Sequence, residues 1–174
     1  MTAMEDPQAH EVLTYDEFGT SVRDLATRVA EEWAPNIVLS VARGGLLLGG
    51  ALGYALDIKA SSVLNVEFYT GIDSRLEEPK ILHPSPKAED LKGMRVLIAD
   101  DVADTGKTLA LVKSWIGSFA AEVRTAVIYE KPQTCFHPDY VWKLTDRWID
   151  FPWSTLPPVT AKGAEAQGTQ KPGR

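Results

Sequence analysis

The residues best suited to chemistry in this chain lie together between positions 95 and 109, in the sequence RVLIADDVADTGKTL. Asp100 and Asp101 follow a short apolar run, and the small and hydroxyl-bearing segment from Asp104 to Thr108 comes next. Carboxylates accept hydrogen bonds from sugar hydroxyls, whereas backbone N–H groups and threonine hydroxyls at the start of a helix bind phosphate. This spacing favours a ligand that carries both a diol and a phosphate group.

The surrounding pattern predicts how these residues are positioned. Residues 96–99 form an unbroken apolar run, typical of a strand that is buried on both faces of a parallel sheet. We expect Asp100 and Asp101 at the carboxyl end of that strand, the edge at which open α/β sheets bind ligands. A helix is expected from Thr105 to Gly117. The alternative is an ordinary strand, turn and helix with surface acids. A Walker P-loop is excluded, because its first glycine would stand at position 101.

The same stretch resembles the PRPP-binding motif of type I phosphoribosyltransferases, where PRPP is 5-phosphoribosyl 1-pyrophosphate. In that motif an apolar run precedes two acidic residues, two further residues and Asp-Thr-Gly-x-Thr. The resemblance implies that Asp100 and Asp101 hold the ribose hydroxyls and, together with PRPP, Mg²⁺. It makes Asp104 the candidate for acid–base catalysis, facing N7 of a purine. The residues that it assigns to the 5-phosphate are Asp104, Thr105, Gly106, Lys107 and Thr108.

A second candidate anion loop follows the apolar run of residues 37–41, which we predict to be a strand. Arg43, Gly44 and Gly45 come next, before an apolar helix. Paired glycines let a backbone approach a ligand closely, and the arginine fork suits phosphate oxygens; a plain tight turn is the alternative. In the family that the chain resembles, the matching loop binds pyrophosphate. Its arginine often follows a non-proline cis peptide bond, which here would join Ala42 to Arg43.

Residues 69–92 contain three prolines and many charges without a sustained period, and they follow a third strand predicted over 62–68. Such a stretch is longer than an ordinary loop in a compact domain. The resemblance implies a mobile lid here and assigns Tyr69 to pyrophosphate binding. The length of the chain predicts a single domain, over residues 13–159. Many relatives have a Ser-Tyr pair at this point, whereas Phe68 precedes the tyrosine in this chain.

Candidates for binding a base come later in the chain. A strand predicted over 123–129 brings Lys131 to the same sheet edge, and purine-specific members of the family use a Lys-Pro here to donate to the exocyclic oxygen of a 6-oxopurine. The sequence WIDFPW resembles an element of bacterial and archaeal 6-oxopurine phosphoribosyltransferases, so Trp148 and Ile149 are implied to bind the base. Aromatic rings stack on bases, but packing of Trp148 in the core is an equal alternative.

Two further residues of this segment bear on the base. Asp150 would favour the amino group of guanine over the oxygen of xanthine if its side chain faced the site. Ser154 stands where xanthine-guanine relatives commonly have an acid, so the role of that acid is not implied for this chain.

Composition narrows the possible partners. The chain has 24 acidic and 18 basic residues, so it lacks the broad basic field of a nucleic-acid binder. A single cysteine, Cys135, fits a reducing compartment. We expect no signal peptide and no membrane span, and therefore a cytoplasmic protein. Residues 1–12 are expected to be flexible and residues 160–174 to be a disordered tail.

Together these patterns predict an α/β fold like that of type I phosphoribosyltransferases, with a mainly parallel, doubly wound sheet and a small hood from the C-terminal segment. The implied activity is Mg²⁺-dependent transfer of the 5-phosphoribosyl group from PRPP to N9 of hypoxanthine, guanine or xanthine, releasing pyrophosphate, in purine salvage. The alternatives are a phosphoribosyltransferase for another base and a non-catalytic sensor of PRPP or nucleotides. Relatives are usually dimers or tetramers, so a homo-oligomer is expected.

Overall fold

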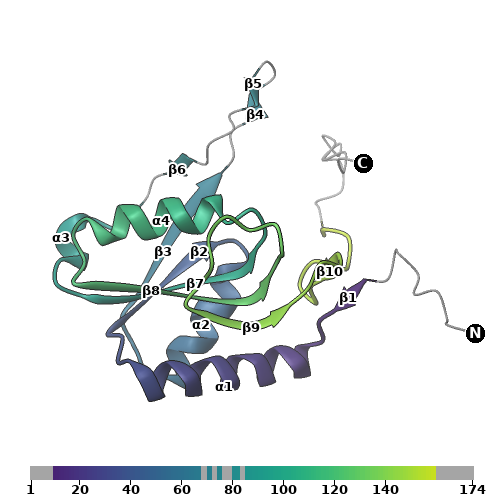
Figure 1. The fold of residues 1–174 in the computed structure, drawn as a ribbon, viewed down its shortest axis with the longest axis horizontal. Helices are drawn as coiled ribbons and strands as arrows, with labels where there is room; N and C mark the ends of the chain where they lie inside the picture. Colours follow the sequence, from purple (N-terminus) through teal and green to yellow (C-terminus); the bar gives the residue numbers. More distant parts are fainter. Residues whose placement is uncertain (1–9, 68–69, 72–73, 76–79, 83–84, 160–174) are drawn as a thin grey trace, which may run out of the picture.

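The computed structural model describes residues 10–67, 70–71, 74–75, 80–82 and 85–159, and it is a sheet with helices on both faces (Figure 1). Among these residues, six strands form the central sheet in the order β6-β3-β2-β7-β8-β9. The central strands are β2 (Ile37–Ala42), β3 (Ser61–Glu67), β6 (Lys80–Leu82), β7 (Arg95–Ala103), β8 (Glu122–Glu130) and β9 (Tyr140–Leu144). Two small pairs join β1 (Glu11–Val12) with β10 (Ile149–Asp150), and β4 (Thr70–Gly71) with β5 (Ser74–Arg75).

The direction of the strands determines where a ligand can bind. All neighbours from β3 to β9 run parallel, and only the pairing of β6 with β3 in the central sheet is antiparallel. The chain leaves β2 toward β3 on one side, whereas it leaves β7 toward β8 and β9 on the other side. The loops after β2 and β7 therefore diverge at neighbouring carboxyl ends, which is the topological switch point where doubly wound sheets bind ligands.

Helices cover both faces of the sheet because its strands are apolar on both faces. In Figure 1, α1 (Tyr15–Glu32) and α2 (Gly45–Ala55) lie on one side, and α4 (Lys107–Gly117) lies on the other. Burial follows the same division: Leu25 and Leu48 belong to one apolar cluster, and Val112 belongs to a second, which also contains Leu91 from the short helix α3 (Ala88–Leu91). The predicted α/β class and mainly parallel sheet are confirmed.

The start of α1 is fixed by a capping box. The Thr14 hydroxyl accepts a hydrogen bond from the Glu17 N–H at 3.2 Å, and the Glu17 carboxylate accepts one from the Thr14 N–H at 2.9 Å. Two N–H groups that the first turn would leave without partners are thereby satisfied. Leu13, directly before the cap, is 1% exposed and joins the core on the α1 side of the sheet.

The structure differs from our expectations in three places. Strand β7 continues through Asp100 and Asp101 to Ala103, so the two acids lie within the strand, near its carboxyl end, and not beyond it. Strand β1 lies inside the N-terminal segment that we expected to be flexible. The described parts of residues 69–92 include the paired strand β6 and the helix α3.

Several sequence predictions fall on residues outside the described part of the chain. Tyr69 is one of them, and the tail over 160–174 is another. The lid function of residues 69–92 and the domain limits stay predictions. Within the described residues, no helix combines the length and the apolar character needed to cross a bilayer.

Candidate active site

The acidic pair at the end of β7 is largely buried. Asp100 is 9% exposed, and its carboxylate accepts hydrogen bonds from the N–H of Asp101, at 2.9 Å, and from the N–H of Gly45. Burial raises the pKa of Asp100 well above its usual range, and the neighbouring charge of Asp101 raises it further. Burial also raises the pKa of Asp101. Two carboxylates in this position favour a ligand that brings hydrogen-bond donors or positive charge.

Magnesium fits this donor set, because it is a hard cation that prefers oxygen ligands. In the described part of the chain, no group of three or more His, Cys, Asp or Glu side chains could hold a metal. Among the described residues, the acidic pair therefore offers Mg²⁺ two neighbouring carboxylates and not a complete cage of side chains. That arrangement is typical of Mg²⁺ sites in which substrate phosphates and water supply the other ligands.

The loop after β2 lies directly against the acidic pair. A Cβ atom on Gly44 would stand 1.9 Å from Oδ2 of Asp101, and one on Gly45 would stand 2.3 Å from the carbonyl oxygen of Ala99. Only glycine leaves enough space at both positions. Arg43 is exposed on this loop, and its peptide bond to Ala42 is cis, which confirms the expectation for that bond.

The predicted 5-phosphate loop occupies the turn between β7 and α4. Gly106 has a φ of 78°, in the left-handed region that favours glycine, and it precedes the first residue of α4. A Cβ atom there would stand 2.4 Å from Oγ1 of Thr134. The Thr105 carbonyl accepts a hydrogen bond from the N–H of Cys135 at 2.9 Å. Residues 105–106 thus pack against residues 134–136, in the loop that follows β8.

Asp104, the candidate acid–base residue, is exposed and receives a hydrogen bond from a residue that our sequence analysis missed. The side-chain amide of Gln133 donates to Oδ1 of Asp104, with Nε2 and Oδ1 2.6 Å apart. Gln133 lies 29 positions further along the chain. Its sequence neighbourhood contains no spacing or motif that would have revealed this contact, apart from its position two residues after Lys131.

Lys131 lies near the C-terminal segment that the resemblance assigns to the base. It is 9% exposed, and its N–H donates to the Ala103 carbonyl at 3.0 Å. The Lys131 ammonium group donates to the carbonyl oxygen of Arg147. An ammonium group has three donors, so this contact leaves capacity for a ligand. Trp148, which follows Arg147 in the sequence, is 69% exposed, and this exposure excludes its packing in the core.

The remaining aromatic residues of WIDFPW anchor the segment to the protein. Phe151 and Trp153 stack with ring centroids 4.9 Å apart, and Trp153 meets Phe18 of α1 edge-on at 5.4 Å. The carboxylate of Asp150 is 2.7 Å from Nδ1 of His10. Ser154 is exposed, and its N–H donates to the Phe151 carbonyl. Residues 148–154 thus form the small hood that the sequence predicted, with its Trp148 ring exposed.

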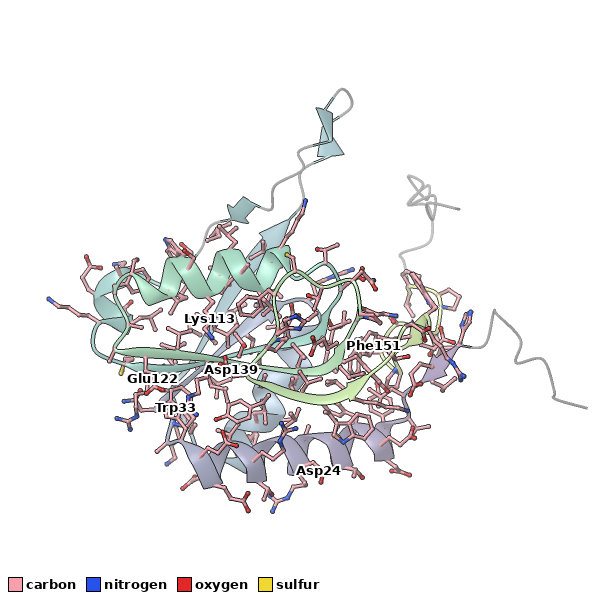
Figure 2. The ribbon with its side chains drawn as sticks, viewed as in Figure 1. Asp24, Trp33, Lys113, Glu122, Asp139 and Phe151 are labelled. Carbon is pink, nitrogen blue, oxygen red and sulfur yellow. The ribbon has the colours of Figure 1, made fainter. Side chains whose placement is uncertain are left out.

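The loop between β8 and β9 is fixed at its far end by Asp139. Its carboxylate accepts hydrogen bonds from the N–H and hydroxyl of Thr125 and from the Lys113 ammonium group, each at 2.8 Å (Figure 2). Burial alone would raise the pKa of Asp139, but the hydrogen bonds from Lys113 and Thr125 outweigh burial and lower it. The same loop carries Gln133, which contacts Asp104, so the hydrogen bonds of Asp139 help to fix the loop that lies against residues 104–106.

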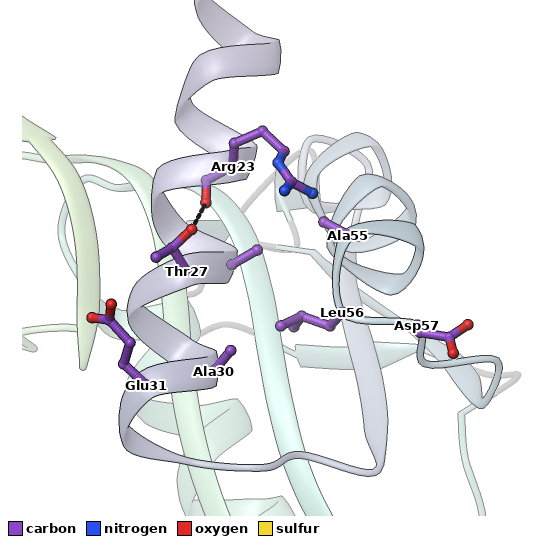
Figure 3. Close-up of a pocket in the computed structure, with 8 residues that line it drawn as sticks. Arg23, Thr27, Ala30, Glu31, Ala55, Leu56 and Asp57 are labelled. Carbon is purple, nitrogen blue, oxygen red and sulfur yellow. Dashed lines mark hydrogen bonds between the residues drawn. The ribbon is translucent and has the colours of Figure 1, made fainter.

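A surface hollow elsewhere in the molecule is not part of this site. Figure 3 shows the hollow, of about 460 Å³, between the second half of α1 and the end of α2. Its lining includes Arg23, Glu31 and Leu56. Helix α2 begins at the acidic pair and ends at the hollow, and its 11 residues span about 16 Å. The hollow therefore lies a helix length from the predicted chemistry.

The structure brings together most of the residues that the sequence singled out. Residues 44–45 contact the acidic pair, and residues 105–106 contact the loop that follows β8, which begins at Lys131. Their assigned roles in binding and catalysis stay predictions.

Comparison with known proteins agrees with this arrangement. Residues 8–158 match the phosphoribosyl transferase domain family. A xanthine-guanine phosphoribosyltransferase of Gluconobacter oxydans is 30% identical over 162 residues, which cover 90% of this chain and 93% of the relative. The crystal structure of a purine phosphoribosyltransferase from Pyrococcus horikoshii has a TM-score of 0.73 and 38% identity, covering 86% of this chain and 97% of that one.

A more distant structure supports the fold alone. The xanthine-guanine-hypoxanthine phosphoribosyltransferase of Helicobacter pylori has a TM-score of 0.71 at 22% identity, covering 84% of this chain and 95% of the other. The family match spans nearly all of the described chain, and the curated relative is matched over almost its whole length. This chain therefore belongs to the phosphoribosyltransferase family.

Proposed function

We propose that this protein transfers the 5-phosphoribosyl group from PRPP to N9 of a 6-oxopurine, giving the nucleoside 5′-monophosphate and pyrophosphate in purine salvage. The base is hypoxanthine, guanine or xanthine. The relatives from Gluconobacter oxydans and Pyrococcus horikoshii, named for xanthine-guanine and purine transfer, support this assignment.

The observation that carries the proposal is the contact between Gly44 and the Asp101 carboxylate. PRPP has its pyrophosphate on C1 of the ribose, next to the 2- and 3-hydroxyls. A PRPP site must therefore place its pyrophosphate loop directly beside the groups that bind the diol. The 5-phosphate lies at the other end of the ribose, and the candidate loop for it, residues 104–108, follows the acids on the opposite side of the switch point from α2.

Each residue has a role in the proposed reaction. Asp100 and Asp101 hold the ribose hydroxyls, residues 104–108 hold the 5-phosphate, and Arg43 with the Gly44 and Gly45 amides holds the pyrophosphate. The resemblance adds Tyr69 as a further contact to the pyrophosphate. Asp100 and Asp101, together with the substrate, would hold Mg²⁺, which would supply positive charge near the leaving pyrophosphate.

In the transfer step, the bond between C1 and the pyrophosphate oxygen breaks and the bond between C1 and N9 of the base forms. Pyrophosphate leaves with the electron pair, and the base loses one proton. Asp104, oriented by Gln133, takes or relays that proton, which leaves from N7 of the base. Because little covalent chemistry falls to the protein, positioning and electrostatic stabilisation supply most of the rate enhancement.

The base is recognised from two sides. The Lys131 ammonium group donates to the exocyclic oxygen of the 6-oxopurine, and the exposed ring of Trp148 stacks on the base. Ile149 contributes through its backbone. A donor opposite the 6-position suits an oxygen and disfavours the amino group of adenine.

A spectrophotometric assay of hypoxanthine, guanine, xanthine and adenine, each with PRPP and Mg²⁺, tests the proposal. We expect turnover with at least one 6-oxopurine and little with adenine. A Lys131→Met variant should lose most of the preference for 6-oxopurines over adenine. PRPP binding without turnover of any base would favour the alternative, a PRPP or nucleotide sensor. We also keep the expectation of a cytoplasmic dimer or tetramer, whose oligomeric state sedimentation velocity would measure.

A further inference from the structure

We propose that residues 10–13, here called the N-terminal strap, position the backbone of residues 148–150 and thereby set the affinity for the base. The proposal rests on the proposed function, because it concerns the residues that would receive the base. The strap contains none of the motifs that the sequence analysis assigned to the active site.

Backbone hydrogen bonds join the strap to the hood. The Glu11 N–H donates to the Trp148 carbonyl at 2.7 Å, and the Leu13 N–H donates to the Asp150 carbonyl at 3.1 Å. Strands β1 and β10 run parallel, with Glu11 opposite Ile149. Successive residues of a strand direct their backbone groups to opposite sides. Because the carbonyls of residues 148 and 150 face the strap, the N–H and C=O of Ile149 point the other way.

Side chains of the strap contact both the hood and the central sheet. Nδ1 of His10 lies 2.7 Å from Oδ2 of Asp150. The Glu11 carboxylate joins the strap to the central sheet: it accepts a hydrogen bond from the Lys143 ammonium group of β9 at 2.5 Å and one from the Tyr129 hydroxyl of β8 at 3.4 Å. Asp150 is thus engaged by the strap, which argues against its carboxylate selecting among bases directly.

The strap is itself firmly anchored. Leu13 is buried in the core, and the capping box that follows it fixes the first turn of α1. From the other side, the Lys131 ammonium group holds the Arg147 carbonyl. The Trp148 backbone is therefore gripped from both sides while its ring stays exposed. A segment whose backbone is held before binding loses less conformational freedom when a base binds to it.

Two deletions isolate the strap. One removes residues 2–9, and the other removes residues 2–12 but keeps Leu13 and the capping box. The longer deletion removes the Glu11 N–H that donates to the Trp148 carbonyl and the His10 ring that contacts Asp150, so we expect it to raise the KM for the base about tenfold. The KM for PRPP and the kcat at saturating base should change less than about twofold, because the acidic pair and both anion loops stay in place. The shorter deletion should behave like the full chain.

Full-length variants give the same test without shortening the chain. Glu11→Pro removes the N–H that donates to Trp148, whereas Glu11→Ala removes only the carboxylate. We expect Glu11→Pro to raise the base KM more than Glu11→Ala. His10→Ala should raise it as well, and His10→Asn, which keeps a donor near the position of Nδ1, should restore it. Amide hydrogen exchange over residues 148–151 should quicken in the longer deletion and in Glu11→Pro only.

The outcomes separate this proposal from the proposed function. If the full chain turns over a 6-oxopurine but the two deletions share one base KM, the strap proposal is wrong and the function stands. A parallel loss of base affinity, PRPP affinity, kcat and melting temperature would also overturn it, because that pattern indicates a general structural role. If the full chain turns over no base, the proposed function itself fails.

Discussion

The side-chain amide of Gln133 donates a hydrogen bond to the carboxylate of Asp104 at 2.6 Å, joining the loop after β8 to the loop after β7. The opposite orientation of the amide would place two oxygens against each other, so the donor must face the carboxylate. Because the Gln133 amide is neutral, the contact orients Asp104 without placing a second charge beside it. It also links the proposed acid–base residue to the loop that carries Lys131.

We predict that Asp104→Asn lowers kcat by about a hundredfold or more, with little change in the KM for PRPP, because it removes proton transfer but keeps the shape of the loop. Gln133→Leu should lower kcat about tenfold, since one hydrogen bond to a charged group is lost. Gln133→Glu should be worse, because it sets two carboxylates against each other.

A double-mutant cycle decides whether Gln133 acts through Asp104. In the Asp104→Asn background, Gln133→Leu should cost nothing further in kcat. Fully additive losses would contradict the positioning role, and equal kcat values for Asp104→Asn and the wild type in steady-state assays would remove the acid–base role.

Gly44 offers a test of the contact between the two loops. An alanine methyl group there would collide with the Asp101 carboxylate, so Gly44→Ala must displace that acid from its position. We predict a loss of kcat/KM for PRPP of about tenfold or more, with a smaller loss of stability. The matched control is Gly50→Ala on α2, where nothing lies within 4 Å of the new methyl group. That change should keep activity and stabilise the helix by about 1 kcal/mol. Equal activities of the two variants would refute the contact.

Asp100 should show a conflict between function and stability. Its pKa in the folded protein is raised above the ordinary 3.8, so the folded state binds a proton more strongly than the unfolded chain does. The free energy of unfolding therefore falls as pH rises from the unfolded pKa through the folded pKa. Asparagine carries no charge, so Asp100→Asn should melt at a higher temperature than the wild type at pH 7. The difference should vanish below about pH 4.

The same substitution should reduce turnover by about a hundredfold, because the ribose hydroxyls and Mg²⁺ lose a charged partner. Differential scanning calorimetry in buffers from acid to neutral pH, alongside steady-state assays, measures both effects. Asp90→Asn, at an exposed acid on α3, serves as the control and should change neither quantity appreciably. A wild-type protein that is more stable than Asp100→Asn at pH 7 would contradict the raised pKa.

The parts of the site that could be predicted from the sequence are those built by local chain geometry. An apolar run followed by acids, glycine and threonine defines a strand, a turn and a helix start, and the structure has β7, Gly106 at a φ of 78° and α4 in that order. The glycines after β2 were found for the same reason, and the resemblance supplied their relation to the acids.

The contacts that escaped prediction join residues far apart in the sequence. Gln133 meets Asp104 across 29 positions, and His10 meets Asp150 across 140. Neither contact leaves a periodic or spacing signal, because each depends on how loops at one sheet edge come together. The two-residue strand β1 is likewise too short to produce a hydrophobic pattern, and it forms because β10 offers it a partner.

The central claim is tested most directly by phosphorus NMR of the protein with PRPP, Mg²⁺ and each 6-oxopurine in turn. The account predicts that the PRPP signals decay and that, with at least one base, a nucleoside 5′-monophosphate and free pyrophosphate appear in equal amounts. In the Asp100→Asn, Asp101→Asn double variant the same signals should stay nearly constant. Intact PRPP with every base, or equal product formation by the double variant, would contradict the account.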